Sequence, residues 1–106
     1  MKPDDQILQD LVEKIVIAVQ PLRILVFGSA ARGSEHPDSD IDLLVVMPEG
    51  VRRRKTAQQL YRQLRGIGVP FDILVVTPGD LEKHKNNLGL IYHTVLREGR
   101  QVYAAA

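Results

Sequence analysis

Apolar residues recur with helical spacing in three parts of the chain. Over residues 5–20 they follow one another at intervals of three and four, which predicts an amphipathic helix that ends before Pro21. A similar pattern predicts helices over residues 51–65 and 88–96. Asp80 follows a Thr-Pro-Gly turn and is predicted to be the N-cap of a further short helix.

Three short runs of consecutive apolar residues predict β-strands instead. They cover residues 22–27, 41–47 and 71–76, and each is bounded by turn-forming residues. Val102 and Tyr103 are predicted to form a short edge strand. Helices and strands in this order predict an α/β (α+β) domain, in which helices flank a small mixed sheet.

Composition narrows the class of protein. A chain of 106 residues with 44% hydrophobic and 25% charged residues is expected to form one domain, over residues 1–106. The absence of cysteine excludes disulfides and thiolate chemistry, and no apolar run is long enough to span a membrane. The polar N-terminus is unlike a secretory signal, so we expect a cytoplasmic protein. A net charge of +1 and the absence of Trp argue against direct binding of nucleic acid.

Three carboxylates stand out against this background. Asp40 and Asp42 lie two residues apart at the start of a predicted strand, so their side chains share one face. Asp72 interrupts the apolar run of another strand, where a buried carboxylate is costly unless it is paired or bound to metal. If the two strands are neighbours, the three carboxylates converge. Carboxylate oxygens suit Mg²⁺, and two such ions would form a site for phosphoryl transfer.

A candidate phosphate-binding turn follows the first predicted strand. Gly28 allows a phosphate to approach the backbone N–H groups closely, and the Ser29 hydroxyl adds a hydrogen-bond donor. Arg32 supplies a positive charge nearby, and Ser39 is a candidate contact to metal or phosphate. Each has a structural alternative, for example an ion pair of Arg32 with a nearby acid. A phosphate-binding turn and an acidic metal site together imply a nucleoside triphosphate.

Two motifs resemble a known family. Residues 28–33 read GSAARG and residues 39–45 read SDIDLLV. Together they resemble the GSxxRG…SDxDLxV signature of the DNA polymerase β-like nucleotidyltransferase superfamily, and the chain as a whole is similar to its minimal members. The resemblance implies that Asp40, Asp42 and Asp72 bind Mg²⁺, that the Gly28-Ser29 turn holds the triphosphate of ATP, and that Asp72 lies near the attacking hydroxyl.

The resemblance also implies a partner. Larger members have a second domain that binds the acceptor, and this sequence leaves little room for one. Minimal members are often paired with a helical HEPN protein in toxin–antitoxin modules, and some antitoxins transfer AMP to a tyrosine of the toxin. We therefore expect a protein adenylyltransferase. Two alternatives remain: an antitoxin that acts by contact alone, and a small-molecule nucleotidyltransferase that a partner subunit completes.

One basic run is not explained by these motifs. Arg52, Arg53, Arg54 and Lys55 are consecutive, and a solvated helix face or loop is their default interpretation. Cations in the first turn of a helix are unfavourable, so the helix predicted here is expected to begin later than this run. Binding of a partner or a phosphate is the less favoured interpretation.

Overall fold

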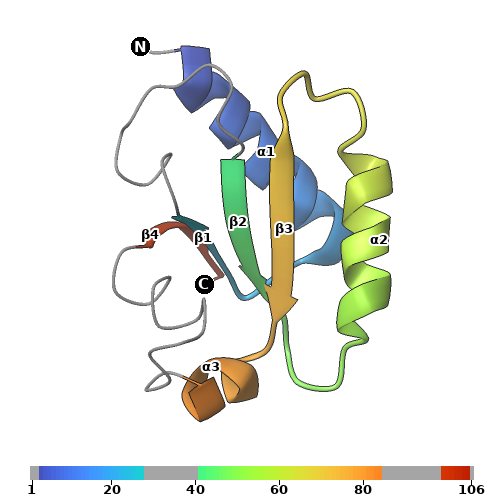
Figure 1. Ribbon diagram of the computed structural model, residues 1–106, viewed down its shortest axis with the longest axis vertical. Helices are drawn as coiled ribbons and strands as arrows, with labels where there is room; N and C mark the ends of the chain where they lie inside the picture. Colours follow the sequence, from blue (N-terminus) through green and yellow to red (C-terminus); the bar gives the residue numbers. More distant parts are fainter. Residues whose placement is uncertain (1–2, 28–40, 85–98, 106) are drawn as a thin grey trace.

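The computed structural model describes residues 3–27, 41–84 and 99–105 of the chain. Their order of helices and strands agrees with the sequence prediction (Figure 1). The helix predicted over residues 88–96 lies outside the described residues. The described elements are α1 (Pro3–Val19), β1 (Arg23–Phe27), β2 (Ile41–Val46), α2 (Arg53–Gln63), β3 (Phe71–Val76), α3 (Pro78–His84) and β4 (Arg100–Ala104).

The four strands form a single mixed sheet, as the sequence predicted. Their order across the sheet is β3-β2-β1-β4, so β3 and β4 are its two edges. β1 is antiparallel to both β2 and β4, whereas β2 and β3 are parallel. The parallel pair is joined through α2, which crosses back along the sheet (Figure 1). This topology places the starts of β2 and β3 at the same end of the sheet.

The first core layer lies between the sheet and the helices α1 and α2. Leu11 and Ile15 of α1 and Leu60 of α2 are fully buried against the sheet. α1 ends at Val19, after which Gln20 adopts a left-handed φ of 51° and leads into a proline. The apolar stripe predicted for this helix is confirmed, because its members pack in the first core, whereas the other side is polar except for the exposed Ile17.

A second, smaller core lies on the opposite face of the sheet. Leu44 and Val46 of β2 point to this face, whereas Leu43 and Val45 point to the first core. Leu81 of α3 covers part of the second core. β2 is therefore buried on both faces, which is why its sequence is apolar without alternation after its second residue.

The outer edge of β3 is supported by Tyr61 of α2. The Tyr61 ring stacks on Phe71, with 5.4 Å between ring centroids and 16° between planes. The Ile73 N–H donates a hydrogen bond of 2.9 Å to the Tyr61 hydroxyl oxygen. An edge strand exposes a row of unpaired backbone groups, so this contact satisfies one of them and ties α2 to β3.

The basic run lies at the beginning of α2, which starts at Arg53. This is two residues later than the apolar pattern predicted, but it is within the basic run and not after it, as the charge argument had suggested. Arg52 is the N-cap residue and makes no side-chain capping bond, and the first turn contains no acid. Arg53 donates a hydrogen bond of 2.7 Å to the Asp80 carboxylate. This ion pair explains how the helix tolerates cations in its first turn, because a carboxylate from α3 offsets part of the unfavourable charge.

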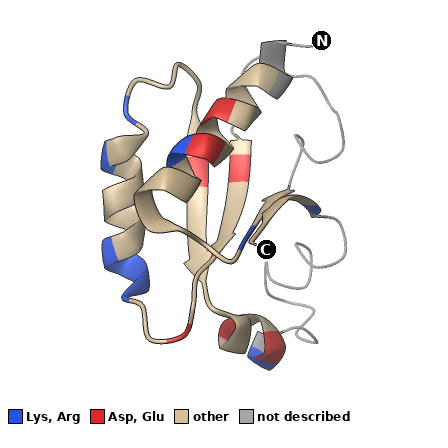
Figure 2. Ribbon diagram, turned by 180° about the vertical axis from the view of Figure 1, so that it is seen from behind, with Lys and Arg blue, Asp and Glu red and all other residues tan. Residues whose placement is uncertain are grey.

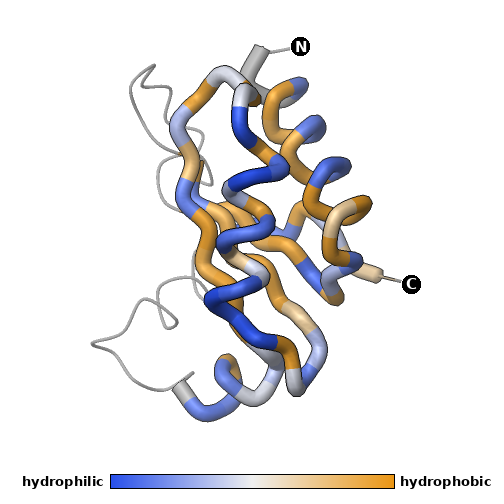
Figure 3. The backbone as a smooth tube through the Cα atoms, turned by 90° about the vertical axis from the view of Figure 1, so that its right-hand side faces the viewer, coloured by the Kyte–Doolittle hydropathy of each residue, from blue (hydrophilic) through white to orange (hydrophobic). Residues whose placement is uncertain are grey.

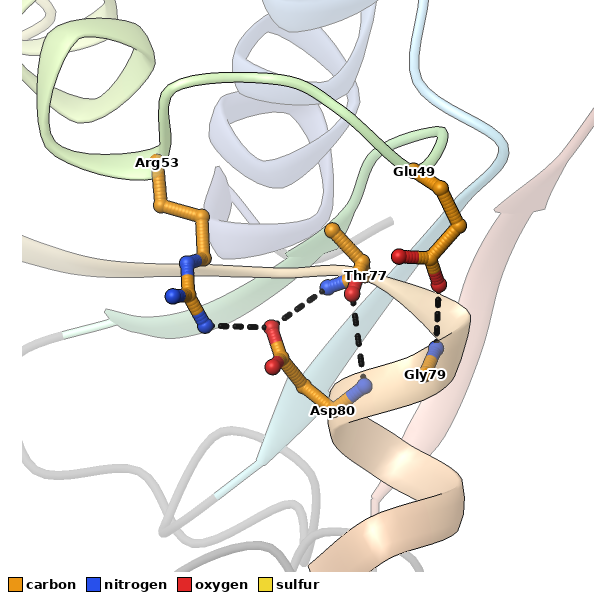
Figure 4. A network of polar contacts seen from close by, with 5 residues as sticks. All are labelled: Glu49, Arg53, Thr77, Gly79 and Asp80. Carbon is orange, nitrogen blue, oxygen red and sulfur yellow. Dashed lines mark hydrogen bonds and ion pairs between the residues drawn. The ribbon is translucent and has the colours of Figure 1, made fainter.

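Thr77, rather than Asp80, caps α3, which corrects the prediction from sequence. The Asp80 N–H donates to the Thr77 hydroxyl at 3.3 Å, and the Thr77 N–H donates to the Asp80 carboxylate at 3.0 Å (Figure 4). The two side chains thus form a capping box with Pro78 at the first helical position. The Glu49 carboxylate accepts a further hydrogen bond from the Gly79 N–H. This network therefore joins the ends of β2 and β3 to the starts of α2 and α3.

The same contacts lower the pKa of Asp80. Burial acts to raise the pKa of this carboxyl, but the bond from the Thr77 N–H and the Arg53 guanidinium together lower it further than burial raises it. The net pKa is therefore below the ordinary value of 3.8. A carboxylate with a lowered pKa stabilises the fold above its unfolded-state pKa, and this contribution is lost as the pH falls through the folded-state value.

We expect Asp80→Asn to destabilise the protein by about 1 kcal/mol at pH 7, because it removes an ion pair and weakens a helix cap. The difference from the wild type should shrink as the pH falls below 3.8, where Asp80 itself becomes protonated. Urea unfolding across this pH range measures the effect. A Glu13→Gln control on exposed α1 should change stability by less than about 0.5 kcal/mol. If the difference in stability persists undiminished at the lowest pH, the negative charge of Asp80 is not what stabilises the fold.

No helix within the part of the chain that the structure describes is both long enough and apolar enough to cross a membrane.

Candidate active site

Asp42 and Asp72 are direct neighbours in the sheet. Each is the second residue of its strand, and the parallel register of β2 and β3 pairs the two residues. Paired residues of adjacent strands point to the same face, with the strands about 4.8 Å apart. Figure 2 shows the two acidic positions side by side near the starts of these strands. The predicted convergence of these two carboxylates is therefore confirmed.

Phe27 completes this row of residues across the sheet. It is the last residue of β1, and the antiparallel register pairs it with Asp42. The ring is 8% exposed and belongs to the second core, on the face to which Asp42 also points. Phe27 thus provides an apolar wall beside the acidic pair. Sequence reasoning did not single it out, although an aromatic residue directly before Gly28-Ser29 was an available signal.

Asp72 is more accessible than its sequence context suggested. Its position inside an apolar run predicted a costly burial, but the side chain is exposed. The reason is that β3 is an edge strand and that its first residues extend beyond the second core. Asp42, on the central strand β2, is half-buried. The pair thus combines one partly enclosed carboxylate with one that a large molecule can approach.

The two carboxylates fit a divalent cation chemically. They provide oxygen ligands of the kind that Mg²⁺ prefers, and a bound cation would offset the repulsion between two negative charges held so close together. Within residues 3–27, 41–84 and 99–105, no group of three potential metal ligands is present. The other residues predicted for the site, Gly28, Ser29, Arg32, Ser39 and Asp40, lie outside the described residues.

Sequence connectivity links the undescribed candidates to this end of the sheet. Gly28 directly follows the last residue of β1, and Asp40 directly precedes the first residue of β2. Phe27 and Ile41, which flank residues 28–40, both lie at the end of the sheet that carries the acidic pair. The polar segment predicted to bind phosphate therefore starts and ends next to Asp42. The opposite end of the sheet carries the network around Thr77 and Asp80.

Comparison with known families gives one match that spans most of the chain. Residues 5–102 match the family described as the nucleotidyltransferase domain. No curated protein matches the chain.

Solved structures share the fold at low sequence identity. A protein from Sulfolobus solfataricus described as a nucleotidyltransferase has a TM-score of 0.64 and 22% identity, over 93% of this chain and 78% of that one. A toxin–antitoxin with AMP-PNP has a TM-score of 0.59 and 22% identity, over 92% and 73% of the two chains. A mutant of the toxin–antitoxin MntA-HpeT has a TM-score of 0.62 and 18% identity, again over 92% and 73%.

Proposed function

Because the chain belongs to the nucleotidyltransferase domain family, and is thus a nucleotidyltransferase, we propose that it transfers AMP from ATP to a hydroxyl of a partner protein. The observation that carries this proposal is the in-register pair of Asp42 and Asp72 at the end of the sheet where the GSAARG and SDIDLLV segments begin or end. The partner in this proposal is a HEPN-type toxin, and this chain is its antitoxin. Similarity to a toxin–antitoxin with AMP-PNP supports both the partner and the nucleotide.

In this proposal Asp40, Asp42 and Asp72 hold two Mg²⁺ ions. When bound, these ions would polarise the α-phosphate and offset the charge that builds up on the leaving pyrophosphate. Gly28 and Ser29 bind the triphosphate through backbone N–H groups and the serine hydroxyl. Arg32 and Ser39 are further candidate contacts to the phosphates.

The protein then aligns the acceptor hydroxyl with the α-phosphorus. The hydroxyl oxygen forms a bond to this phosphorus, the bond to the bridging oxygen of the β-phosphate breaks, and pyrophosphate leaves. Asp72 is placed to orient the hydroxyl and accept its proton, because it is exposed on an edge strand and can be reached by a side chain of another protein. Most of the rate enhancement comes from positioning and electrostatics.

The test is transfer of α-labelled ATP, with Mg²⁺, to proteins of the native lysate. The wild type and Asp42→Asn are compared side by side. We expect a labelled protein band with the wild type alone, and its excision identifies the acceptor. The same bands with both proteins, or no band at all, would count against transfer to a protein. Neutralisation of the toxin by Asp42→Asn would then favour an antitoxin that acts by contact, and label on a small molecule would favour a small-molecule acceptor.

A further inference from the structure

Positive charge is concentrated on one element of this nearly neutral protein. Residues 50–71 contain six of the 14 Lys and Arg residues and none of the 13 Asp and Glu residues. The rest of the chain therefore has five more acids than cations, while the net charge of the whole is only +1. Figure 2 shows this basic charge at both ends of α2. The active-site acids and the triphosphate-binding segment do not explain this distribution.

Four of these cations make up what we call the basic face of α2: Arg54 and Lys55 in its first turn, Arg62 in its last turn and Arg65 just after its end. Arg54 and Arg62 lie eight residues apart on the same side of the helix, with Gln58 between them. All four cations are exposed, and the buried Leu60 and Leu64 lie on the other side. The side of α2 that faces the viewer in Figure 3 is correspondingly hydrophilic. From Arg54 to Arg62 the face is about 12 Å long, from the helical rise over eight residues, and Arg65 extends it beyond the end of the helix.

The basic face has no acidic partner among the residues that the structure describes. Arg53 is the one cation of this segment with such a partner, since it pairs with Asp80. The acids nearest in sequence, Glu49 and Asp72, lie just outside residues 50–71. Like charges repeated along a helix repel one another, and salt bridges with a partner would relieve this repulsion.

We infer that the basic face of α2 binds an acidic surface of the acceptor protein. This inference rests on the proposed function, because it assigns a docking surface to that acceptor. α2 packs along β3, the edge strand that carries Asp72, and Tyr61 links the two elements by stacking on Phe71. The Asp72 side chain points to the opposite face of the sheet, with Asp42 and the second core, so a protein bound to α2 reaches this carboxylate around the outer edge of β3. Electrostatic attraction at such a surface mainly raises the association rate and sets the orientation.

Charge and aromatic content favour a protein over a nucleic acid. A nucleic acid longer than the basic face would meet the rest of the protein, which carries a net excess of five acids. The exposed aromatic residue of α2, Tyr61, already has one ring face stacked on Phe71, and the chain has no Trp to stack on bases. A compact protein with a local acidic patch can cover the short basic face without contacting the acidic remainder of the chain.

The test compares two double variants with the same change in net charge. Arg54→Glu with Arg62→Glu reverses two cations of the basic face. Lys14→Glu with Lys83→Glu reverses two exposed cations on α1 and α3. The probes are a fluorescein-labelled 20-residue polyglutamate, which represents an acidic protein surface, and a single-stranded RNA of 20 nucleotides. Fluorescence anisotropy measures the Kd of each probe at low and high salt.

We expect the basic-face variant to raise the Kd for polyglutamate at least about tenfold at low salt, and the control variant to change it less than about twofold. High salt should weaken polyglutamate binding to the wild type, because the interacting charges are exposed. Equal weakening by both variants would overturn the inference. Tighter binding of RNA than of polyglutamate, lost with the basic-face variant, would overturn it in favour of a nucleic acid.

The labelling assay separates this inference from the proposed function. With the basic-face variant we expect label on the acceptor protein to appear about tenfold more slowly, while the rise in Tm caused by Mg²⁺ and ATP stays as in the wild type. If the wild type labels no protein, the proposed function fails and the Kd measurements alone decide about the basic face. If labelling is normal with the basic-face variant, the docking surface is wrong and the proposed function stands.

Discussion

Asp42→Asn is expected to lower the rate of nucleotide transfer about a thousandfold. A catalytic metal ion contributes several kcal/mol to stabilisation of the transition state, and each 1.36 kcal/mol corresponds to a factor of about ten in rate. Asparagine keeps the size of the side chain but removes a negative oxygen next to Asp72, so the site loses most of its attraction for Mg²⁺. Initial rates with saturating acceptor measure the loss.

Two measurements separate a lost metal site from a lost fold. Mg²⁺ with ATP should raise the Tm of the wild type, by an amount corresponding to about 2.7 kcal/mol at a hundredfold excess over Kd, and should not raise that of Asp42→Asn. The Tm without ligand should be similar for both proteins. Glu13→Gln, which removes one negative charge from exposed α1, serves as the control and should keep full activity. Full activity of Asp42→Asn would refute the proposal that this carboxylate binds a catalytic Mg²⁺ ion.

The acidic pair shows which features of the site can be predicted from the sequence and which cannot. Period-two spacing and an apolar run place Asp42 and Asp72 near the starts of two strands, and the structure confirms the strand bounds within one residue. The relative register of the two strands depends on how α2 and its connections return the chain, which no local pattern encodes. The register pairs Asp42 with Asp72 directly, and a shift of one residue would turn one of them to the other face.

The features that sequence reasoning missed depend on contacts between distant elements. Asp72 is exposed because β3 is an edge strand, and strand order cannot be read from a single apolar run. The start of α2 among its cations depends on Asp80, which lies 27 residues further along the chain. Thr77 was the more local signal, since a threonine before proline with an acid three residues later is typical of a capping box. Position alone had suggested Asp80 as the cap.

Two isoleucines of α1 allow the largest effect on stability to be tested with a matched control. Ile15 and Ile17 lie two residues apart, which turns their side chains about 200° from each other around the helix axis. Ile15 is 0% exposed in the first core, whereas Ile17 is 82% exposed. The same substitution to alanine therefore removes the same atoms from two opposite environments on one helix.

Ile15→Ala is expected to lower the free energy of unfolding by about 3 kcal/mol, because it removes buried methyl groups and leaves a cavity between α1 and the sheet. Ile17→Ala should change it by no more than about 0.5 kcal/mol, since alanine loses little there and favours the helix slightly. Urea unfolding should show a lower midpoint with an unchanged slope for Ile15→Ala alone. Similar losses for both variants would contradict this expectation. They would mean that Ile17 is also covered in solution, by a surface that does not belong to the core of this chain.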